Sequence, residues 1–236
     1  MRFLVGSILL LVGLVVAACA APTPTPTITP TPLPLGPLKV GLQAPGGGTV
    51  HLGDVFTVEV ASTPEGHRIL RGEVVVSFDP RHVKLLESSG GSLLPLATFA
   101  STVGGSSVQG VFLQVDPSAP LRQPGSLVVL RFKARQDALA ATTEVALVRI
   151  SVVDETGQTF PLDQKATTLT LSLDGVPGDI NRSGRVDVVD LALLGAAFGT
   201  RGGDPLYKAT ADLNEDGVVG AQDLDVLGAY YGKRTR

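Results

Sequence analysis

The sequence predicts a mainly β-sheet sandwich of the jelly-roll kind, followed by a small all-α module made of two loop–helix repeats. Three observations support this fold class. Apolar and polar residues alternate along several stretches of residues 38–173. Turn-forming Gly, Pro and Asp residues separate these stretches. A segment near the C-terminus occurs twice, starting at Asp179 and again 33 residues later at Asp212. A chain of 236 residues is long enough for one mid-sized domain and a small additional module.

Residues 1–18 have the layout of a secretory signal peptide. Arg2 precedes an uncharged apolar stretch that ends in small residues just before Cys19, the only cysteine of the chain. This ending resembles the lipobox of bacterial lipoproteins, which implies that Cys19 becomes the lipidated first residue of the mature protein. The alternatives are an uncleaved membrane anchor and a plain signal peptide with a chance cysteine. The lipoprotein interpretation predicts a protein exported and anchored to the outer face of the cell membrane.

Residues 19–37 are predicted to be a stalk. Proline and threonine alternate from Pro22 to Thr27, and proline recurs up to Pro37. Because proline lacks the N–H and fixes φ, neither helix nor central strand can form. A polyproline-II conformation at roughly 3 Å per residue gives a semi-rigid spacer of about 50 Å. The threonines can carry O-glycans. A passive disordered linker is the alternative, and it has nearly the same role of setting distance from the membrane.

Residues 38–173 are predicted to form the sandwich. Apolar residues alternate with polar ones in FTVEV, VVVSF, SLVVLRFKA and TEVALVRIS, which start at Phe56, Val74, Ser126 and Thr143. A period of two, with many Val and Thr residues, is typical of half-buried strands. About eight or nine short strands without intervening helical patterns favour a sandwich over βαβ units.

The duplicated segment has the spacing of a twelve-residue calcium loop. Loop positions one, three, five, seven, nine and twelve are Asp179, Asn181, Ser183, Arg185, Asp187 and Asp190 in the first copy. They are Asp212, Asn214, Asp216, Val218, Gly220 and Asp223 in the second. Position seven offers its backbone carbonyl, and glycine at position six allows the sharp turn. Ser183 is a weaker ligand, and at Gly220 water takes the ligand's place. Calcium takes six to eight oxygen ligands, and each loop offers oxygens of this kind.

A helix is predicted after each loop. The first shows an apolar stripe at Leu191, Leu194 and Phe198, and the second shows the same stripe at Leu224, Leu227 and Tyr231. We expect the two stripes to pack on each other around a pseudo-twofold axis. Gly199 and Gly232 suit the C-terminal ends of these helices. Val186 and Val219, at loop position eight, are predicted to pack the two loops together.

Two calcium loop–helix repeats with Asp at position twelve closely resemble a type I dockerin domain, over residues 178–232 of a module that spans 174–236. The resemblance implies two calcium ions, one in each loop, and a module that folds when they bind and then docks onto a cohesin. It also implies that partner choice lies at loop positions ten and eleven. These positions hold Val188, Val189, Ala221 and Gln222. The two faces are therefore unequal, and the first is more apolar. The alternative is that Val188 and Val189 are merely helix-packing residues.

Residues 38–173 in turn resemble a cohesin, the jelly-roll partner of dockerins. The resemblance rests on GDVFTVEV from Gly53, VVVSFDPRHVKLLESSGG from Val74 and GSLVVLRFKA from Gly125. It implies a non-catalytic adaptor that joins proteins at the cell surface, as such modules do in polysaccharide-degrading complexes. Its partners would be exported proteins that carry cohesins or dockerins, or further copies of the same chain joined head to tail. A formal net charge of −3 offers no basic face for nucleic acid.

Two other functions are weighed against the adaptor. A carbohydrate-binding module usually offers aromatic faces to sugars, but the chain has no Trp and its three Tyr all follow residue 200. A glycosidase needs paired carboxylates in a cleft, whereas the acidic residues of 38–173 are scattered, mostly at predicted turns or strand ends. No Gly-x-Ser-x-Gly motif is present. We therefore predict that the chain is not an enzyme.

Overall fold

A computed structural model of the protein describes residues 38–63, 69–93, 98–101, 107–113, 124–139, 142–154, 159, 162–166 and 168–235. The chain divides into two compact units, Met1–Pro34 and Leu35–Arg236, and all described residues belong to the second. The predicted signal peptide, Cys19 and the Pro/Thr-rich stalk therefore lie outside the described residues. The described part of the chain contains no helix with the length and apolar character needed to cross a bilayer.

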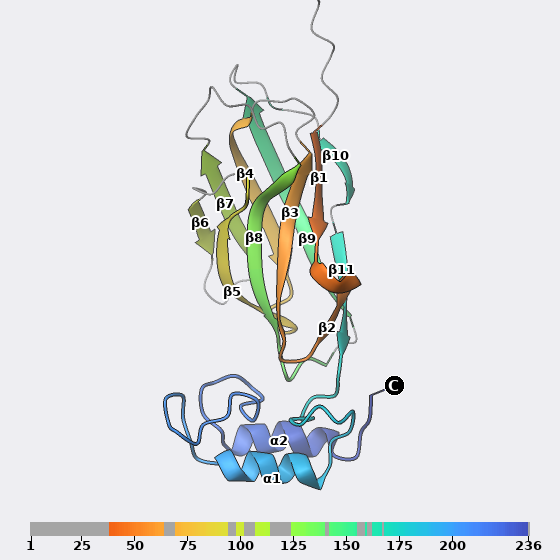
Figure 1. Cartoon of the computed structure of the whole chain (residues 1–236), viewed down its shortest axis with the longest axis vertical. Coiled ribbons are helices and arrows are strands. Elements are labelled where there is room, and N and C mark those ends of the chain that lie inside the picture. The colour runs from red at the N-terminus through yellow and green to blue at the C-terminus, as the bar shows by residue number, and fades with distance from the viewer. Residues whose placement is uncertain are drawn as a thin grey trace, which may run out of the picture. The chain divides into compact units, whose positions relative to one another are not determined.

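Two β-sheets form the larger module (Figure 1). One has the strand order β10-β1-β3-β8-β5 and the other the order β2-β11-β9-β4-β7-β6. The strands are β1 (Leu38–Gln43), β2 (Thr49–His51), β3 (Val55–Thr63), β4 (Ile69–Phe78), β5 (Val83–Gly90), β6 (Thr98–Ser101), β7 (Ser107–Leu113), β8 (Gly125–Ala134), β9 (Thr142–Asp154), β10 (Leu162–Ala166) and β11 (Thr168–Asp174). A 3-10 turn, η1 (Pro45–Gly48), precedes β2. The pairings are antiparallel except β1 with β10 and β2 with β11, which are parallel.

The described ranges hold eleven strands, more than the eight or nine predicted. The four predicted stretches are confirmed as β3, β4, β8 and β9. The additional strands include β2, β6 and β10, which have three, four and five residues. Strands this short contain too few residues to display a period-two pattern, so periodicity alone does not reveal them.

The sandwich core is formed by apolar residues of these alternating stretches. Val58 of β3 lies opposite Leu130 of β8, and both side chains are fully buried. The ring of Phe132 packs against Phe56 at 5.7 Å between centroids and against Phe78, on the other sheet, at 5.0 Å with an edge-to-face geometry. Aromatic pairs in such arrangements stabilise a core beyond their buried area. The two sheets are thus joined through a phenylalanine cluster.

A second, smaller core belongs to the C-terminal module, where α1 (Val188–Ala197) packs on α2 (Ala221–Tyr230). Its buried members are Val176, Val186, Leu194, Ala197, Ala211, Leu213, Val219 and Leu227. Val186 and Val219 are both fully buried in this one core, which confirms that position eight packs the loops together. Gly199 and Gly232 directly follow the C-cap residues of α1 and α2 and have φ near +80°. This confirms that they end the two helices.

The predicted apolar stripes are correct at only one position in each helix. Leu194 and Leu227 are buried, but Leu191, Phe198, Leu224 and Tyr231 are 39–51% exposed. The cause is the carboxylate at loop position twelve: Asp190 and Asp223 are fully buried and fix the rotation of their helices. In α1, Leu194 and Ala197 lie four and seven places after Asp190 and therefore face inward as well. Leu191 directly follows Asp190, so its side chain is turned by about 100° from that direction. The stripes therefore do not pack on each other as predicted.

Candidate calcium loops and partner face

The first loop is curled by its own side chains. The Asp179 carboxylate, at position one, accepts hydrogen bonds from the backbone N–H of Ser183 at 2.9 Å and of Gly184 at 2.7 Å. Asn181, at position three, accepts a second bond from the Ser183 N–H at 2.9 Å. The φ of Gly184 is +83°, a conformation that glycine adopts without strain. The predicted ligand positions one, three and five therefore meet in one hydrogen-bonded turn.

The second loop repeats this geometry 33 residues later. Asp212 accepts from the N–H of Asp216 at 3.2 Å and of Gly217 at 2.9 Å. Asn214 accepts from the Asp216 N–H at 3.0 Å. The residue at position four has a left-handed backbone in both loops, with φ of 57° at Arg182 and 60° at Glu215. The two loops thus share one backbone conformation although their side chains differ.

The position-twelve carboxylates tie each helix to its loop. Asp190 accepts hydrogen bonds from the N–H of Asn181 at 3.1 Å and of Asp187 at 2.9 Å. Asp187 is itself the N-cap of α1 and accepts from the Val189 N–H. Asp223 accepts from the N–H groups of Leu213, Asn214 and Gly220 at 2.7, 3.2 and 2.6 Å.

The segment after each helix pairs with the loop of the other copy. After α1, the Gly199 N–H donates to Val219 O at 2.8 Å and the Val219 N–H donates to Thr200 O at 2.9 Å. After α2, the Gly232 N–H donates to Val186 O at 2.8 Å and the Val186 N–H donates to Lys233 O at 3.1 Å. Position seven takes part as well, because Arg185 bridges to Arg234 and Val218 bridges to Arg201. Neither repeat is complete without the other.

The buried carboxylates of the loops fit a bound cation. Asp190, Asp212 and Asp223 are at most 4% exposed. No Lys, Arg or His of the described residues forms an ion pair with them. An uncompensated buried charge costs several kcal/mol, which backbone N–H groups offset only in part. These loops therefore have the electrostatic character that a divalent cation would complete.

The donor set points to a hard cation. Among the described residues, no three His, Cys, Asp or Glu side chains gather tightly enough to hold a metal ion on their own. A cation here would also need the amide oxygens of Asn181 and Asn214, the Ser183 hydroxyl, the backbone carbonyls of Arg185 and Val218, and water. Calcium accepts this mixture of oxygens, whereas zinc prefers His and Cys ligands that the loops lack.

Tyr207 contacts the second loop and was missed from the sequence. Its hydroxyl donates a hydrogen bond of 2.6 Å to Asp212 Oδ2. Burial, followed by this hydrogen bond to a carboxylate, raises the pKa of Tyr207 to about 12. The equivalent position of the first repeat is Asp174, so no repeated pattern marks Tyr207 as part of a site.

Positions ten and eleven lie on the surface. Val188 is 63% exposed and Val189 is 50% exposed, and Ala221 and Gln222 are exposed too. The valines are therefore not core residues, which contradicts the helix-packing alternative. Further apolar residues share this exposure and were not predicted as a surface. We call the α1 face the set Val188, Val189, Leu191, Leu193 and Phe198. The second repeat exposes Leu224 and Tyr231.

Three phenylalanines and one carboxylate of the sandwich have structural roles. Phe56, Phe78 and Phe132 are buried, so they offer no face to a sugar. Asp79 is held by Arg81, whose guanidinium donates to it at 2.6–3.2 Å. This side-chain bond, followed by the Arg81 backbone N–H, lowers the pKa of Asp79 to about 2. Asp79 is thus a turn-stabilising carboxylate.

Comparison with known proteins gives both modules relatives. Residues 177–230 match the family model described as the dockerin type I domain. The chain is similar to the cohesin CaCohA2 from Clostridium acetobutylicum, with 16% identity and a TM-score of 0.50 over 58% of this chain and 90% of that one. It is also similar to a chain of the Coh-OlpA–Doc918 cohesin–dockerin complex from Clostridium thermocellum, with 11% identity, 58% and 99% coverage and a TM-score of 0.49.

A non-cellulosomal cohesin from the archaeon Archaeoglobus fulgidus is similar as well, with 19% identity, 57% and 91% coverage and a TM-score of 0.45. No curated protein sequence matches the chain. The match to CaCohA2 assigns the cohesin fold to the sandwich, and the fold class predicted from the sequence is thereby confirmed.

Proposed function

Because residues 177–230 are a type I dockerin domain and the sandwich has the cohesin fold, we propose that the chain is a calcium-dependent adaptor that joins proteins through cohesin–dockerin contacts. The presence of both halves of such a contact in one chain is the observation that carries this function. Cohesins and dockerins are non-catalytic assembly modules, and no catalytic domain is evident in the described residues.

Two calcium ions, one per loop, are part of the proposal. Type I dockerins bind calcium in general, and bound calcium would supply positive charge to the buried carboxylates. The ligands would be the side chains of Asp179, Asn181, Ser183, Asp187 and Asp190 with the Arg185 carbonyl, and in the second loop Asp212, Asn214, Asp216 and Asp223 with the Val218 carbonyl. Dissociation constants of about 10⁻⁴–10⁻³ M suffice for extracellular modules. Metal binding then contributes folding free energy to a module without disulfides.

The α1 face is the proposed docking surface for a cohesin. Its five apolar side chains are 39–63% exposed in the presence of the rest of the chain. Several exposed apolar residues on one helix are typical of a protein-binding surface. The second repeat replaces the two valines by Ala221 and Gln222. The preferred partner should therefore offer an apolar patch and should engage the first repeat rather than the second.

The partner of each module is either a foreign protein or another copy of this chain. The sandwich of one molecule and the dockerin of the next can form a head-to-tail contact, which repeats into rings or filaments. Alternatively, the sandwich holds a foreign dockerin while the dockerin recruits a foreign cohesin. We favour an exported protein lipidated at Cys19, on the signal-like layout of residues 1–19, and a role in polysaccharide degradation, by analogy with cohesin–dockerin systems.

Sedimentation velocity of the full chain in millimolar calcium and in chelator tests self-association. A calcium-dependent increase in sedimentation coefficient would identify a self-assembling scaffold. If the chain stays monomeric, calorimetric titration against purified cohesins from the same cell tests foreign partners. A chain that is folded by calcium, yet binds neither itself nor any of these cohesins, would contradict the adaptor function.

A matched pair of variants locates the docking surface. Val188→Asp with Val189→Asp should abolish the calcium-dependent contact. Ala221→Asp with Gln222→Asp places the same charges at the equivalent positions of the second repeat and should leave most of it. Equal losses in both variants would show that the two faces are used alike.

A further inference from the structure

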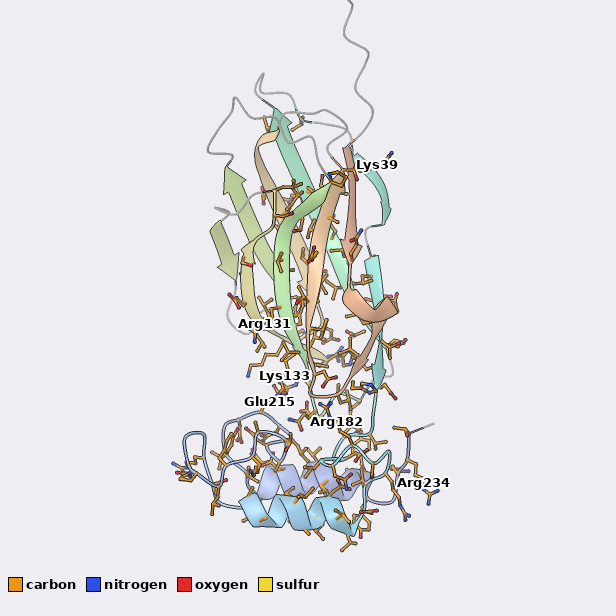
Figure 2. All side chains as sticks on the ribbon, viewed as in Figure 1. Lys39, Arg131, Lys133, Arg182, Glu215 and Arg234 are labelled. Carbon is orange, nitrogen blue, oxygen red and sulfur yellow. The ribbon has the colours of Figure 1, made fainter. Side chains whose placement is uncertain are left out.

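The two calcium loops carry opposite charges at the same position. Arg182 and Glu215 both occupy loop position four, 33 residues apart, with left-handed backbone. A positive φ is uncommon for residues other than glycine. Within the compact unit Leu35–Arg236, each reaches a residue of opposite charge on the sandwich. Arg182 Nη2 lies 2.5 Å from Asp54 Oδ1, and Glu215 Oε1 lies 2.9 Å from Lys133 Nζ (Figure 2).

The Glu215 contact is the more buried of the two. The Glu215 side chain is 6% exposed and that of Lys133 is 20% exposed. Lys84 Nζ lies 3.9 Å from the other carboxylate oxygen. Within the described part of the chain, neither carboxylate oxygen of Glu215 accepts a hydrogen bond. The positive charges of Lys133 and Lys84 are therefore what compensates the buried negative charge of Glu215. The Arg182–Asp54 pair is half-exposed, and solvent weakens it.

Two hydrogen bonds to the backbone of the dockerin accompany these charges. Arg135 Nη2 donates to Asn214 O at 3.1 Å, next to Glu215 in the second loop. Gln136 Nε2 donates to Ala209 O at 2.8 Å. The guanidinium of Arg135 is held in place by Asp137 at 2.9 and 3.0 Å. The end of β8 and the turn after it therefore provide Lys133, Arg135 and Gln136 as one contact site.

From these contacts we propose that position four of the two calcium loops forms a charge latch that fixes the dockerin onto the sandwich of the same chain. Only residues 175–178 separate β11 from the first loop, so the latch closes at a high effective concentration and weak pairs suffice. The latch uses the loops and not the helices, and the α1 face stays exposed while it is closed. The same dockerin can thus be latched within its chain and still present the α1 face.

Residual dipolar couplings of the backbone amides of the full chain, in millimolar calcium, test the latch. If it is closed, one alignment tensor will fit the sandwich and the dockerin together. Glu215→Lys, which faces Lys133 and Lys84 with a third positive charge, should give two separate tensors. Adding Lys133→Glu to that variant should restore a single tensor. Asp225→Lys, a reversal of an exposed charge on α2, is the control that should leave one tensor.

The result does not depend on the loop variant folding. Lys133→Glu alone changes only the sandwich, and it should also separate the two tensors because the introduced carboxylate would repel that of Glu215. The amide spectrum reports in the same sample whether the dockerin is folded. Two tensors in the unmodified, calcium-loaded chain would overturn the latch, as would a single tensor that is lost on dilution and so reflects contact with a second molecule. This test uses no partner, so its outcome is separate from that of the adaptor function.

Discussion

The hydroxyl of Tyr207 donates a 2.6 Å hydrogen bond to Asp212, the first residue of the second loop, where we propose that calcium binds. The backbone N–H of Gly217 donates to the same oxygen, Asp212 Oδ2. Together the two hydrogen bonds fix the orientation of the Asp212 carboxylate. Groups that orient a metal ligand typically change metal affinity by about 10–100-fold when they are removed. The first loop has no such tyrosine, so the two loops should differ in calcium affinity.

We expect Tyr207→Phe to weaken calcium binding at the second loop by roughly tenfold, because Asp212 loses its outer partner while the core keeps the ring. Isothermal titration of the full chain with calcium measures this change. Tyr231→Phe removes a hydroxyl from an exposed ring at the end of α2 and serves as the control. Identical titration curves for Tyr207→Phe and the unmodified chain would rule out a positioning role.

Removing both position-twelve carboxylates should abolish calcium-dependent folding of the dockerin. Asp190→Ala with Asp223→Ala deletes one ligand from each loop and also frees the backbone N–H groups that these buried side chains accept from. The helical circular dichroism signal of this variant should no longer rise when calcium is added. Asp225→Ala, on the exposed side of α2, should respond like the unmodified chain. A calcium-induced rise in the double variant would contradict the ligand assignment.

Deleting residues 232–236 should affect the first loop and spare the second. The tail supplies the Gly232 N–H and Lys233 O partners of Val186, and the Thr235 N–H that donates to Gly184 O. Hydrogen exchange at the Val186 amide should therefore accelerate by at least about tenfold, whereas the Val219 amide keeps its partner Thr200. Removal of Arg236 alone is the control. Equal acceleration at Val186 and Val219 would mean that the tail stabilises the module as a whole.

Asp79 should stabilise the sandwich at neutral pH but not in strong acid. Its pKa is lowered to about 2 from an ordinary value of 3.8, so its stabilisation is fully present above pH 3.8 and is lost as the pH falls through 2. Because Arg81 is 82% exposed, we expect Asp79→Asn to lower the free energy of unfolding by only about 0.5–1 kcal/mol at pH 7. Urea unfolding at pH 7 and pH 2, with Glu144→Gln as an exposed control, measures this difference. A deficit that is equally large at pH 2 would show that the carboxylate charge is not responsible.

The sequence was most informative where a local pattern determines the structure. Alternation identified β3 and β8 because Val58 and Leu130 are fully buried, whereas the residues on either side of each are not. Loop spacing predicted the turns that Asp179 and Asp212 close, because all residues of each turn lie within twelve consecutive positions.

Predictions failed where the structure depends on a buried carboxylate or on contacts between residues far apart in the sequence. The apolar stripe at Leu191 and Phe198 suggested one rotation of α1, but the buried carboxylate of Asp190 imposes another. Hydropathy gives no weight to a carboxylate that is buried among backbone N–H groups. The pair Lys133–Glu215 joins residues from two modules, and neither its charges nor its spacing distinguish it from other surface residues in a single sequence.

The exchange of tails between the repeats determines how such a module can be divided. A peptide with one loop and one helix would leave the N–H and C=O of its position-eight valine unpaired. A second peptide of the same kind could pair them, since each tail completes the opposite loop. Fusion of two such units replaces that concentration-dependent encounter with an intramolecular one. The two halves of a fused module also need not have the same sequence. One half here has Arg182 and two surface valines, whereas the other has Glu215, Ala221 and Gln222 at the same positions. Symmetry of the backbone and asymmetry of the surface are thus compatible in a single chain.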